Sequence, residues 1–282
     1  MKIEAYAKVN FTLEVFGTRA DGYHALRSLV VPISLADTLE IEEALDIASD
    51  TGYPDDLVVK AAKTLRASVP ADGRVRGARI HVVKRIPAGG GLGGGSADAA
   101  ATLVALNDLW TLGLSRDELA AIGAQVGSDV PALVLGGPVV MEGRGEKVTR
   151  LDCGVRRPLN LVLANPGVFS STKEVYRRCT ARLQNDGSIL YNMKRAFESG
   201  DCEAVAAAMM NDLQQPAVEL HPEIGGALAA LKAAGAVGVT MSGSGSTVFG
   251  LVPTEARGRE IAALLGAKGL KAWSVQTRCP VV

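Results

Sequence analysis

A glycine-rich segment at residues 87–100, PAGGGLGGGSADAA, constrains the fold more than any other part of this 282-residue chain. Every residue from 89 to 95 is glycine except Leu92, and a helical pattern rich in alanine follows from Ser96. Backbone without side chains can approach a partner closely. Its N–H groups, together with the positive end of a helix dipole, favour a bound phosphate. The segment therefore predicts a phosphate-binding loop, with a tight structural turn as the alternative.

Two known phosphate-loop motifs overlap this segment, and neither fits it. Gly89, Gly91 and Gly94 have the spacing of the dinucleotide fingerprint. The nearest acidic residue at a suitable distance is Asp108, which falls inside the predicted helix rather than after a second strand. The P-loop motif requires a lysine after its last glycine, and a serine stands there instead. The segment therefore indicates phosphate binding of another kind.

The charge balance disfavours several classes of function. The chain has 30 Lys and Arg against 30 Asp and Glu, and zero net charge is unsuited to coating nucleic acid or an anionic membrane. The densest basic stretch, residues 74–85, has no interleaved aromatic side chains on which bases could stack. We interpret this stretch, Lys84 and Arg85 included, as a solvated face. We therefore expect small-molecule partners, with no nucleic acid and no membrane.

Cysteine usage and hydropathy indicate a cytoplasmic protein. The four cysteines lie far apart without a C-x-x-C pair, so the sequence lacks a zinc knuckle or a dithiol redox motif. Reduced thiols are the default in a chain of this size. The longest nearly apolar run, residues 130–141, is too short to span a bilayer. Glu4 and Lys8 interrupt the N-terminal stretch where a signal peptide needs an apolar core.

Hydrophobic periodicity predicts a mixed α+β chain in two parts. A change of texture near residue 152 predicts a boundary between domains 1–151 and 152–282. A hairpin is predicted between residues 133–135 and 139–142, across Gly136 and Gly137. Helices are predicted at 56–68, from 96 onward, and at 115–126, 172–183, 188–199, 201–210, 222–234 and 254–265. Strands are predicted at 3–7, 11–16, 28–33, 38–42, 78–84, 159–164, 237–241, 248–252 and 270–277.

Two charged residues outside the glycine segment are candidates for a functional role. Lys8 is a lone cation between strand-like segments, and a surface lysine on an edge strand is the simpler interpretation. Asp129 lies in the turn GSDVP between a helix and an apolar run, where an Asx turn or a helix cap is the simpler interpretation. Taken alone, each segment favours the structural role.

Two further segments leave alternatives open. Residues 241–249, MSGSGSTVF, form a small-residue loop between two apolar strands. This loop is either an undemanding hairpin or a second wall of backbone N–H groups facing an anion. His24 follows a turn at Asp21 and Gly22 and is a candidate site residue, although packing in the turn is the simpler role. The other two histidines have no partner at metal-ligand spacing.

In combination, five segments of the chain resemble the GHMP kinases, small-molecule kinases that use a glycine-serine loop in place of a P-loop. Within them the likeness is greatest to the enzymes whose substrate is a cytidine diphosphate ester of methylerythritol. The likeness covers nearly the whole chain, and five motifs in the same order are far more specific than one. The segments are AKVNFTLEVFGTRADGYHAL (7–26), PAGGGLGGGSADAA (87–100), GSDVP (127–131), NDLQQPA (211–217) and MSGSGSTVFGL (241–251).

The resemblance implies a two-domain α+β kinase. Its N-terminal domain is expected to have the ribosomal-protein-S5-like fold and its C-terminal domain a ferredoxin-like fold, with ATP and substrate in the cleft between them. The implied reaction is ATP-dependent phosphorylation of the 2-hydroxyl of the methylerythritol unit, a step of the non-mevalonate route to isoprenoid precursors. Mg²⁺ is expected to accompany ATP, and the sequence does not assign its ligands.

The resemblance also assigns roles to individual residues. Asp129 is expected to orient or deprotonate the attacking hydroxyl, and Lys8 is expected to be its cationic partner. The cytosine ring is expected to stack between Tyr23 and Tyr176. The expected substrate-binding residues are Asn10, Tyr23, His24, Thr172, Tyr176, Gly243 and Ser244. The expected ATP-binding residues are Pro87, Ala88, Gly89, Gly90, Gly91, Leu92, Gly93, Gly94, Gly95, Ser96 and Ala97.

One departure from the family pattern and three rival functions accompany this assignment. The helix that usually begins Asn-Leu, with a side-chain contact to adenine, begins here with Asp56 and Leu57. A kinase of the same superfamily that acts on homoserine or mevalonate is the nearest rival, and the Tyr23-His24 segment with Tyr176 favours a substrate that carries a nucleotide. A nicotinamide oxidoreductase and a non-catalytic nucleotide-binding protein are the rivals from other classes.

Overall fold

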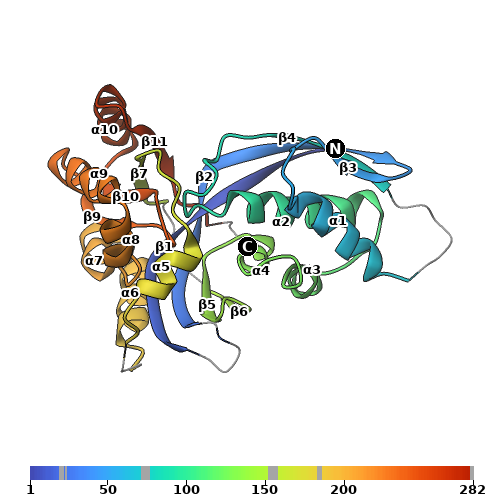
Figure 1. Cartoon of the computed structure of the whole chain (residues 1–282), viewed down its shortest axis with the longest axis horizontal. Coiled ribbons are helices and arrows are strands. Elements are labelled where there is room, and N and C mark those ends of the chain that lie inside the picture. Colours follow the sequence, from blue (N-terminus) through green and yellow to red (C-terminus); the bar gives the residue numbers. More distant parts are fainter. Residues whose placement is uncertain (19–21, 23, 71–76, 152–157, 183–185, 280–282) are drawn as a thin grey trace. The chain divides into compact units, whose positions relative to one another are not determined.

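The structure, a computed structural model, describes all residues of the chain except 19–21, 23, 71–76, 152–157, 183–185 and 280–282 (Figure 1). The chain forms two units, each assembled from separate segments. The first unit contains residues 1–7, 35–88 and 93–136, and the second contains residues 8–34, 89–92 and 137–282. The boundary predicted near residue 152 lies outside the described residues, so the division into 1–151 and 152–282 stays a prediction.

Two long strands, β1 (Lys2–Thr18) and β2 (His24–Ala44), contribute residues to both units. In the first unit β2 pairs antiparallel with β4 (Gly77–Val83), and β4 pairs parallel with β3 (Ile47–Ser49). Along β4, buried Ala78, Ile80 and Val82 alternate with exposed residues. This period of two turns one face of the strand toward the core of the unit.

Four helices complete the described part of the first unit, and two of them begin at side-chain caps. Asp56 caps the first helix by accepting hydrogen bonds from Val58 N and Val59 N, and Ser115 with Glu118 forms a capping box on the third. Figure 1 shows α1 and α2 side by side, where alanines on both helices permit close packing. The helices are α1 (Leu57–Ala67), α2 (Gly94–Leu109), α3 (Arg116–Gly123) and α4 (Val130–Leu135).

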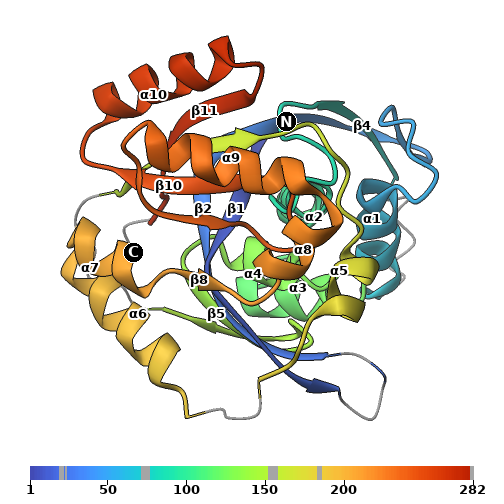
Figure 2. The ribbon, with the colours of Figure 1, turned by 60° about the vertical axis from the view of Figure 1, so that its left-hand side comes forward.

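The second unit is built on a sheet of antiparallel neighbours in the order β11-β7-β10-β9. Two helices pack on one face of this sheet, and Figure 2 shows both of them beside the strands. Their core residues include Ile224 and Leu231 from one helix and Ile261 and Leu265 from the other. The elements are β7 (Asn160–Asn165), β9 (Val237–Met241), β10 (Val248–Val252), β11 (Lys271–Gln276), α9 (Pro222–Ala233) and α10 (Glu255–Ala267).

The rest of the second unit includes the second half of β1, the first half of β2 and the elements that pack or pair with them. On β1, the ring of Phe11 meets Phe197 and Phe249 edge to face, with ring centroids 5.5 and 5.6 Å away. One short strand pairs with β1 and two form a meander beside β2. The elements are β5 (Val139–Gly143), β6 (Lys147–Arg150), β8 (Met210–Asn211), α5 (Thr172–Arg178), α6 (Ser188–Ser199), α7 (Cys202–Ala208) and α8 (Gln214–Leu220).

Most of the predicted elements are confirmed, but the strands predicted at 3–7 and 11–16 form one strand, as do those at 28–33 and 38–42, and the helix predicted at 172–183 ends at Arg178. One further prediction is wrong. The hairpin predicted between residues 133–135 and 139–142 does not form, because residues 133–135 belong to α4. Pro131 stands in the first turn of this helix, where its fixed φ suits helix initiation, and Gly136 ends the helix at φ +78°. The strand that follows, β5, pairs with β2 and β6 instead.

Within the described part of the chain, no helix has both the length and the apolar composition that crossing a lipid bilayer requires.

Candidate functional site

A tight segment at residues 242–247 connects β9 to β10 and organises the candidate site in the second unit. It closes on itself through a hydrogen bond from Ser242 N to Thr247 O of 3.0 Å and another from Gly245 N to Ser242 O of 3.0 Å. Gly243 and Gly245 have φ values of +57° and +85°, which favour glycine. We call residues 242–247 the serine-glycine segment.

The serine-glycine segment donates hydrogen bonds to carbonyl oxygens in the first part of the glycine-rich segment, which we call the glycine loop. Ser242 Oγ donates to Gly91 O at 2.9 Å, and Thr247 N donates to Gly90 O at 3.0 Å. Lys8 N donates to Leu92 O at 3.0 Å. In a trans peptide the carbonyl and the next N–H point in opposite directions. The N–H groups of Gly91 and Leu92 therefore point away from these anchors, as an anion-binding loop requires.

The glycine at position 91 is required by the fold itself. Its φ is +75°, and an ideal Cβ built there would lie 2.1 Å from Ser242 O. A side chain would separate the two segments that the hydrogen bond from Ser242 joins. Close approach of backbone to backbone therefore explains this glycine.

Lys8 lies inside β1 and is 5% exposed, so the interpretation as a surface lysine is wrong. Its Nζ donates to Asn10 Oδ1 at 2.8 Å, and Asn10 Nδ2 donates to Ser28 Oγ at 2.8 Å. Ser28 Oγ in turn donates to Thr12 O at 2.5 Å. An ideal Cβ on Gly243 would lie 3.4 Å from Lys8 Nζ. A buried hydrogen-bonded chain therefore holds an ammonium group beside the serine-glycine segment.

Residues expected to bind the substrate meet the same segment from α5. Thr172 Oγ1 and Ser244 Oγ are hydrogen-bonded at 2.8 Å. One helical turn beyond Thr172, the ring of Tyr176 stacks on the ring of His24, with centroids 5.6 Å apart and planes 29° apart. Tyr23 lies outside the described residues. The other expected substrate residues, including Asn10 and Gly243 next to Lys8, all lie in the second unit.

Two residues at this site were not singled out from the sequence. Asn211 Nδ2 donates to Met241 O at 2.7 Å and to Gly243 O at 2.8 Å, which holds one end of the serine-glycine segment. Ser28 links Asn10 to the backbone of β1. Asn211 begins the motif NDLQQPA, and Ser28 lies two residues after the motif at 7–26. For Ser28, a polar residue at the start of a predicted apolar strand was the available signal.

In the first unit a cluster of charged side chains, largely buried, lies next to the first turn of α2. Lys84 Nζ donates to Asp37 Oδ2 at 2.5 Å and to Asp98 Oδ2 at 2.6 Å. Asp37 and Asp98 are 0% and 3% exposed. An ideal Cβ on Gly94 would lie 3.6 Å from Lys84 Nζ. The interpretation of Lys84 as part of a solvated face is therefore wrong, whereas Arg85 is exposed as expected.

The cluster contains two carboxyl groups and one ammonium group, and this imbalance of charge affects the pKa of Asp98. Asp98 Oδ1 is buried without a hydrogen-bond partner among the described residues. The pKa of Asp98 is raised to about 7. Burial is the largest cause, and the nearby Asp37 adds to the rise, whereas the hydrogen bond and charge of Lys84 oppose it. A proton on Asp98 near neutral pH therefore balances the cluster.

Asp129 is half-buried at the N-terminal end of α4. It occupies the capping position, but its side chain makes no capping hydrogen bond to that helix, so the simpler interpretation as a cap is not supported. The same turn lies near the start of α2, because an ideal Cβ on Gly127 would lie 3.9 Å from Ser96 Oγ. The first unit thus brings the GSDVP turn next to the second part of the glycine segment.

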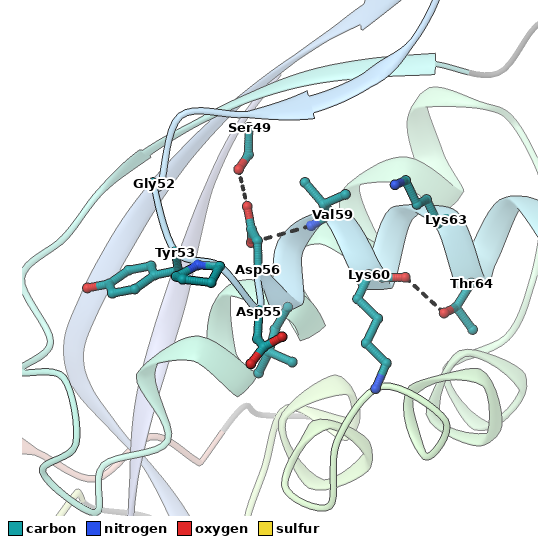
Figure 3. A pocket seen from close by; sticks show the side chains of 11 residues that line it. Ser49, Gly52, Tyr53, Asp55, Asp56, Val59, Lys60, Lys63 and Thr64 are labelled. Atoms are coloured by element: carbon teal, nitrogen blue, oxygen red, sulfur yellow. Dashed lines mark hydrogen bonds between the residues drawn. The ribbon is translucent and has the colours of Figure 1, made fainter.

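A cavity of about 740 Å³ opens at the start of α1, also in the first unit (Figure 3). Its volume is within the range of about 300–1,000 Å³ that is common for small-molecule sites. Asp56 in its wall accepts hydrogen bonds from Val58 N at 2.8 Å and Thr51 Oγ1 at 2.8 Å, and also from the Ser49 hydroxyl. The cavity is lined by Ser49, Gly52, Tyr53, Pro54, Asp55, Asp56, Leu57, Val59, Lys60, Lys63 and Thr64.

The cavity adjoins the first turn of α2 through Leu57. An ideal Cβ on Gly95 would lie 3.5 Å from Leu57 Cδ1, an ordinary van der Waals distance. Gly95 is exposed and its φ is not positive. The described fold therefore does not require a glycine at position 95, in contrast to position 91.

Comparisons with known proteins cover both parts of the chain. Residues 56–137 match the family model described as GHMP kinases N terminal domain, and residues 193–270 match the model described as GHMP kinases C terminal. A relative from Symbiobacterium thermophilum, named 4-diphosphocytidyl-2-C-methyl-D-erythritol kinase, is 41% identical over 288 residues. That alignment covers 98% of this chain and 99% of the relative.

Solved structures support the same relationship. The crystal structure of a 4-(cytidine 5'-diphospho)-2C-methyl-D-erythritol kinase matches with a TM-score of 0.85 at 34% identity, covering 99% of this chain and 100% of the other. A homoserine kinase from Cytophaga hutchinsonii matches with a TM-score of 0.75 at 17% identity, covering 99% and 94%. The second match shows the fold alone.

The contrast between the two glycines can be tested by replacing each with alanine. We expect Gly95→Ala to leave the protein folded and to increase its stability by up to about 1 kcal/mol, because alanine is the better helix former. We expect the same variant to bind ATP more weakly, since the added methyl group occupies space that a phosphate needs. Gly91→Ala should lower the unfolding free energy. Thermal unfolding and nucleotide titration measure the two effects.

Unchanged ATP affinity in Gly95→Ala would remove the N-terminal turn of α2 from the phosphate site. A stable Gly91→Ala protein would show that the close contact between Gly91 and Ser242 is dispensable.

The buried charge cluster should give the protein a specific pH dependence of stability. In the unfolded chain the pKa of Asp98 returns to the ordinary range near 4, so between about pH 4 and 7 the folded state binds a proton that the unfolded state has lost. The contribution of Asp98 is therefore present below about pH 4 and lost as the pH rises through about 7. We expect Asp98→Asn to remove this dependence, because its amide replaces a protonated carboxyl group.

Urea unfolding at pH 5 and pH 8 measures the effect. The stability of Asp98→Asn relative to the natural protein should increase from pH 5 to pH 8. The exposed Asp108, on the same helix, provides a matched control, because Asp108→Asn removes a carboxyl group without touching the buried cluster. A constant difference between Asp98→Asn and the natural protein would show that Asp98 does not titrate in this range.

Proposed function

The chain belongs to the GHMP kinases, and on that premise we propose that it transfers the γ-phosphoryl group of ATP to the 2-hydroxyl of 4-diphosphocytidyl-2-C-methyl-D-erythritol. This is the reaction of the non-mevalonate isoprenoid route that the sequence motifs favour. The observation that carries the proposal is 41% identity to a relative of that name over 98% of the chain. Homoserine kinase shares the fold at only 17% identity.

The glycine segment is proposed to bind the triphosphate of ATP. Residues 90–92 are held by their carbonyl oxygens, which directs the N–H groups of Gly91 and Leu92 to the opposite side. Gly95 and Ser96 lie in the first turn of α2, where the helix dipole favours negative charge. Backbone donors along residues 89–96 would therefore neutralise the phosphates without a P-loop lysine.

The cavity at the start of α1 is proposed to take the adenine base. It lies in the same unit as the first turn of α2, and Leu57 adjoins both. Asp56 stands where the family has an asparagine that contacts adenine. Its carboxylate accepts hydrogen bonds from α1, Thr51 and Ser49, and a carboxylate cannot donate to the ring nitrogens of adenine. We therefore assign Asp56 to the wall of the cavity, with base contacts made by other lining groups.

Mg²⁺ is proposed to arrive with ATP. Among the residues that the structure describes, no three His, Cys, Asp or Glu side chains come together as a metal site. Magnesium commonly binds through substrate phosphates and water with one or two carboxylates at most, so these residues are compatible with metal bound mainly by ATP. Its chemical contribution would be to neutralise charge on the phosphates.

The proposed transfer forms a bond between the 2-hydroxyl oxygen of the substrate and the γ-phosphorus. The bond from that phosphorus to the bridging oxygen of ATP breaks, and ADP leaves. Asp129 is proposed to orient the hydroxyl and accept its proton, as a positioned base does. Lys8 is proposed to stabilise the negative charge on the transferred group, and its burial means that little water screens its ammonium.

The cytidine end of the substrate is proposed to bind near α5. Tyr176 supplies an aromatic face, and Thr172 and Ser244 supply hydroxyl groups. His24 covers one face of Tyr176, so a cytosine stacked on Tyr176 either uses the other face or displaces His24. Base–aromatic stacking contributes about 1–3 kcal/mol and does not distinguish bases. Selection of cytosine is therefore assigned to polar groups such as His24.

The proposed function can be tested with a panel of alcohols. We expect ATP and 4-diphosphocytidyl-2-C-methyl-D-erythritol to give ADP and a new phosphomonoester in the phosphorus NMR spectrum. The uridine analogue should react less efficiently, and mevalonate and homoserine should not react. Transfer to mevalonate or homoserine alone would identify another kinase of the same superfamily. Tight ATP binding without transfer to any alcohol would indicate a non-catalytic nucleotide-binding protein.

Two substitutions test the proposed catalytic pair. We expect Asp129→Asn to lower kcat by about 10²-fold or more with little change in substrate binding, because a positioned base acts mainly in the transition state. We expect Lys8→Met, which keeps the length of the buried side chain without its charge, to lower kcat by about 10²-fold or more. Steady-state kinetics and thermal unfolding separate these effects from a loss of fold.

The exposed Lys147 on β6 provides the matched control, and Lys147→Met should keep the natural kcat. Turnover within a few-fold of the natural protein in either Asp129→Asn or Lys8→Met would remove that residue from the mechanism.

A further inference from the structure

An exposed aromatic side chain, Phe169, lies directly on the glycine loop. The residue is 72% exposed, although large apolar side chains are usually buried. An ideal Cβ on Gly89 would lie 2.6 Å from Cδ2 and 2.8 Å from Cε2 of the Phe169 ring. One edge of the ring therefore packs against the backbone of Gly89, and most of its surface faces solvent. Both residues belong to the second unit.

The backbone on both sides of Phe169 is fixed to the serine-glycine segment. Ser246 Oγ donates to the carbonyl oxygen of Val168 at 2.5 Å, and Ser170 Oγ donates to Ser244 O at 2.6 Å. Asn165 Nδ2 also donates to Thr247 Oγ1 at 2.9 Å. Because the residues immediately before and after it are anchored, Phe169 is presented at a defined place, and little backbone entropy is lost if a ligand covers its ring.

The serine-glycine segment holds both the chain that carries the Phe169 ring and the first part of the glycine loop. Thr247 N and Ser242 Oγ hold the carbonyl oxygens of Gly90 and Gly91, while Ser244 and Ser246 hold the chain that carries Phe169. The ring and the peptide groups next to Gly89 thus keep one relative position through a common support. The ring leaves most of its surface in water, so burial in the core of the described residues does not account for an apolar side chain at this position.

We propose that the ring of Phe169 covers the first part of the glycine loop and keeps water away from the bound triphosphate. This inference rests on the proposed function, because it assigns the phosphates of ATP to that loop. An aromatic ring is at most a weak acceptor for the N–H groups of the loop, so it does not compete with the charged oxygens of phosphate. It excludes water from one side, which favours an alcohol over water as the group that attacks phosphorus.

The two competing reactions differ only in the attacking oxygen. In transfer, the substrate hydroxyl oxygen bonds to the γ-phosphorus, the bond to the bridging oxygen of ATP breaks, and the hydroxyl proton is released to a base. In hydrolysis, a water oxygen takes that place, and the products are ADP, inorganic phosphate and a proton. A side chain that only shields the phosphate changes the ratio of these products more than it changes substrate affinity.

Replacement of Phe169 tests the proposal through that ratio. With ATP and 4-diphosphocytidyl-2-C-methyl-D-erythritol, we expect Phe169→Ala to raise inorganic phosphate relative to phosphomonoester by about fivefold or more, as loss of water exclusion predicts. The apparent constant for the alcohol should stay close to that of the natural protein. Phe169→Leu, which retains an apolar cover, should stay near the natural ratio. Coupled detection of phosphate and phosphorus NMR of the ester give the two amounts.

A matched control is available on another surface of the second unit. Tyr191 on α6 is 59% exposed, and Tyr191→Ala should leave the product ratio unchanged. Thermal unfolding of all three variants checks that they fold.

Two outcomes would overturn the inference. One is an unchanged product ratio in a folded Phe169→Ala protein. The other is a large rise in the constant for the alcohol without extra phosphate, which would make the ring a substrate contact. Absence of phosphomonoester with the natural protein would instead contradict the proposed function, so the two failures are distinguishable.

Discussion

The hydrogen bonds from the serine-glycine segment to Gly90 and Gly91 are the interaction on which the rest of the second unit's site depends. Because they use carbonyl oxygens, they fix the loop and leave the N–H edges of the same peptides directed the other way. The segment also meets Thr172 and lies beside the Lys8 ammonium. A single short connection between two strands thus fixes residues 90 and 91 and contacts Thr172 by hydrogen bonds, and it lies beside the Lys8 ammonium that Asn10 holds.

Two glycines of the loop illustrate how the fold and the ligand can each require the same residue type. At position 91 a side chain would meet Ser242 O at 2.1 Å, so packing within the protein accounts for the glycine. At position 95 the nearest atom is Leu57 Cδ1 at 3.5 Å, and alanine would suit the helix better. The described structure leaves the second glycine unexplained without a ligand that approaches the first turn of α2. Under the proposed function, the run of glycines combines a packing constraint at position 91 with a ligand constraint at position 95.

The motifs predicted the fold better than they predicted the burial of individual candidate residues and the hydrogen bonds that support them. Capping at Asp56 and Ser115 was predictable, because it depends on residues only two or three positions away. The burial of Lys8 was not, since it depends on a hydrogen-bonded chain through Asn10 and Ser28, residues brought together by pairing of distant strands. The burial of Lys84 was not predictable either, because it also depends on residues that are distant in sequence. Its partners Asp37 and Asp98 are 47 and 14 residues away, and no local pattern indicates them.

Amide hydrogen exchange with and without a non-hydrolysable ATP analogue tests most directly the claim that a pre-formed segment presents a phosphate-binding backbone. The amides of Ser242, Gly245 and Thr247 donate hydrogen bonds within the protein, so we expect them to exchange slowly even without nucleotide. Amides of residues 89–96 should slow when the analogue binds. Rapid exchange at residues 242–247 in the free protein, or unchanged exchange at residues 89–96 with saturating analogue, would contradict this arrangement.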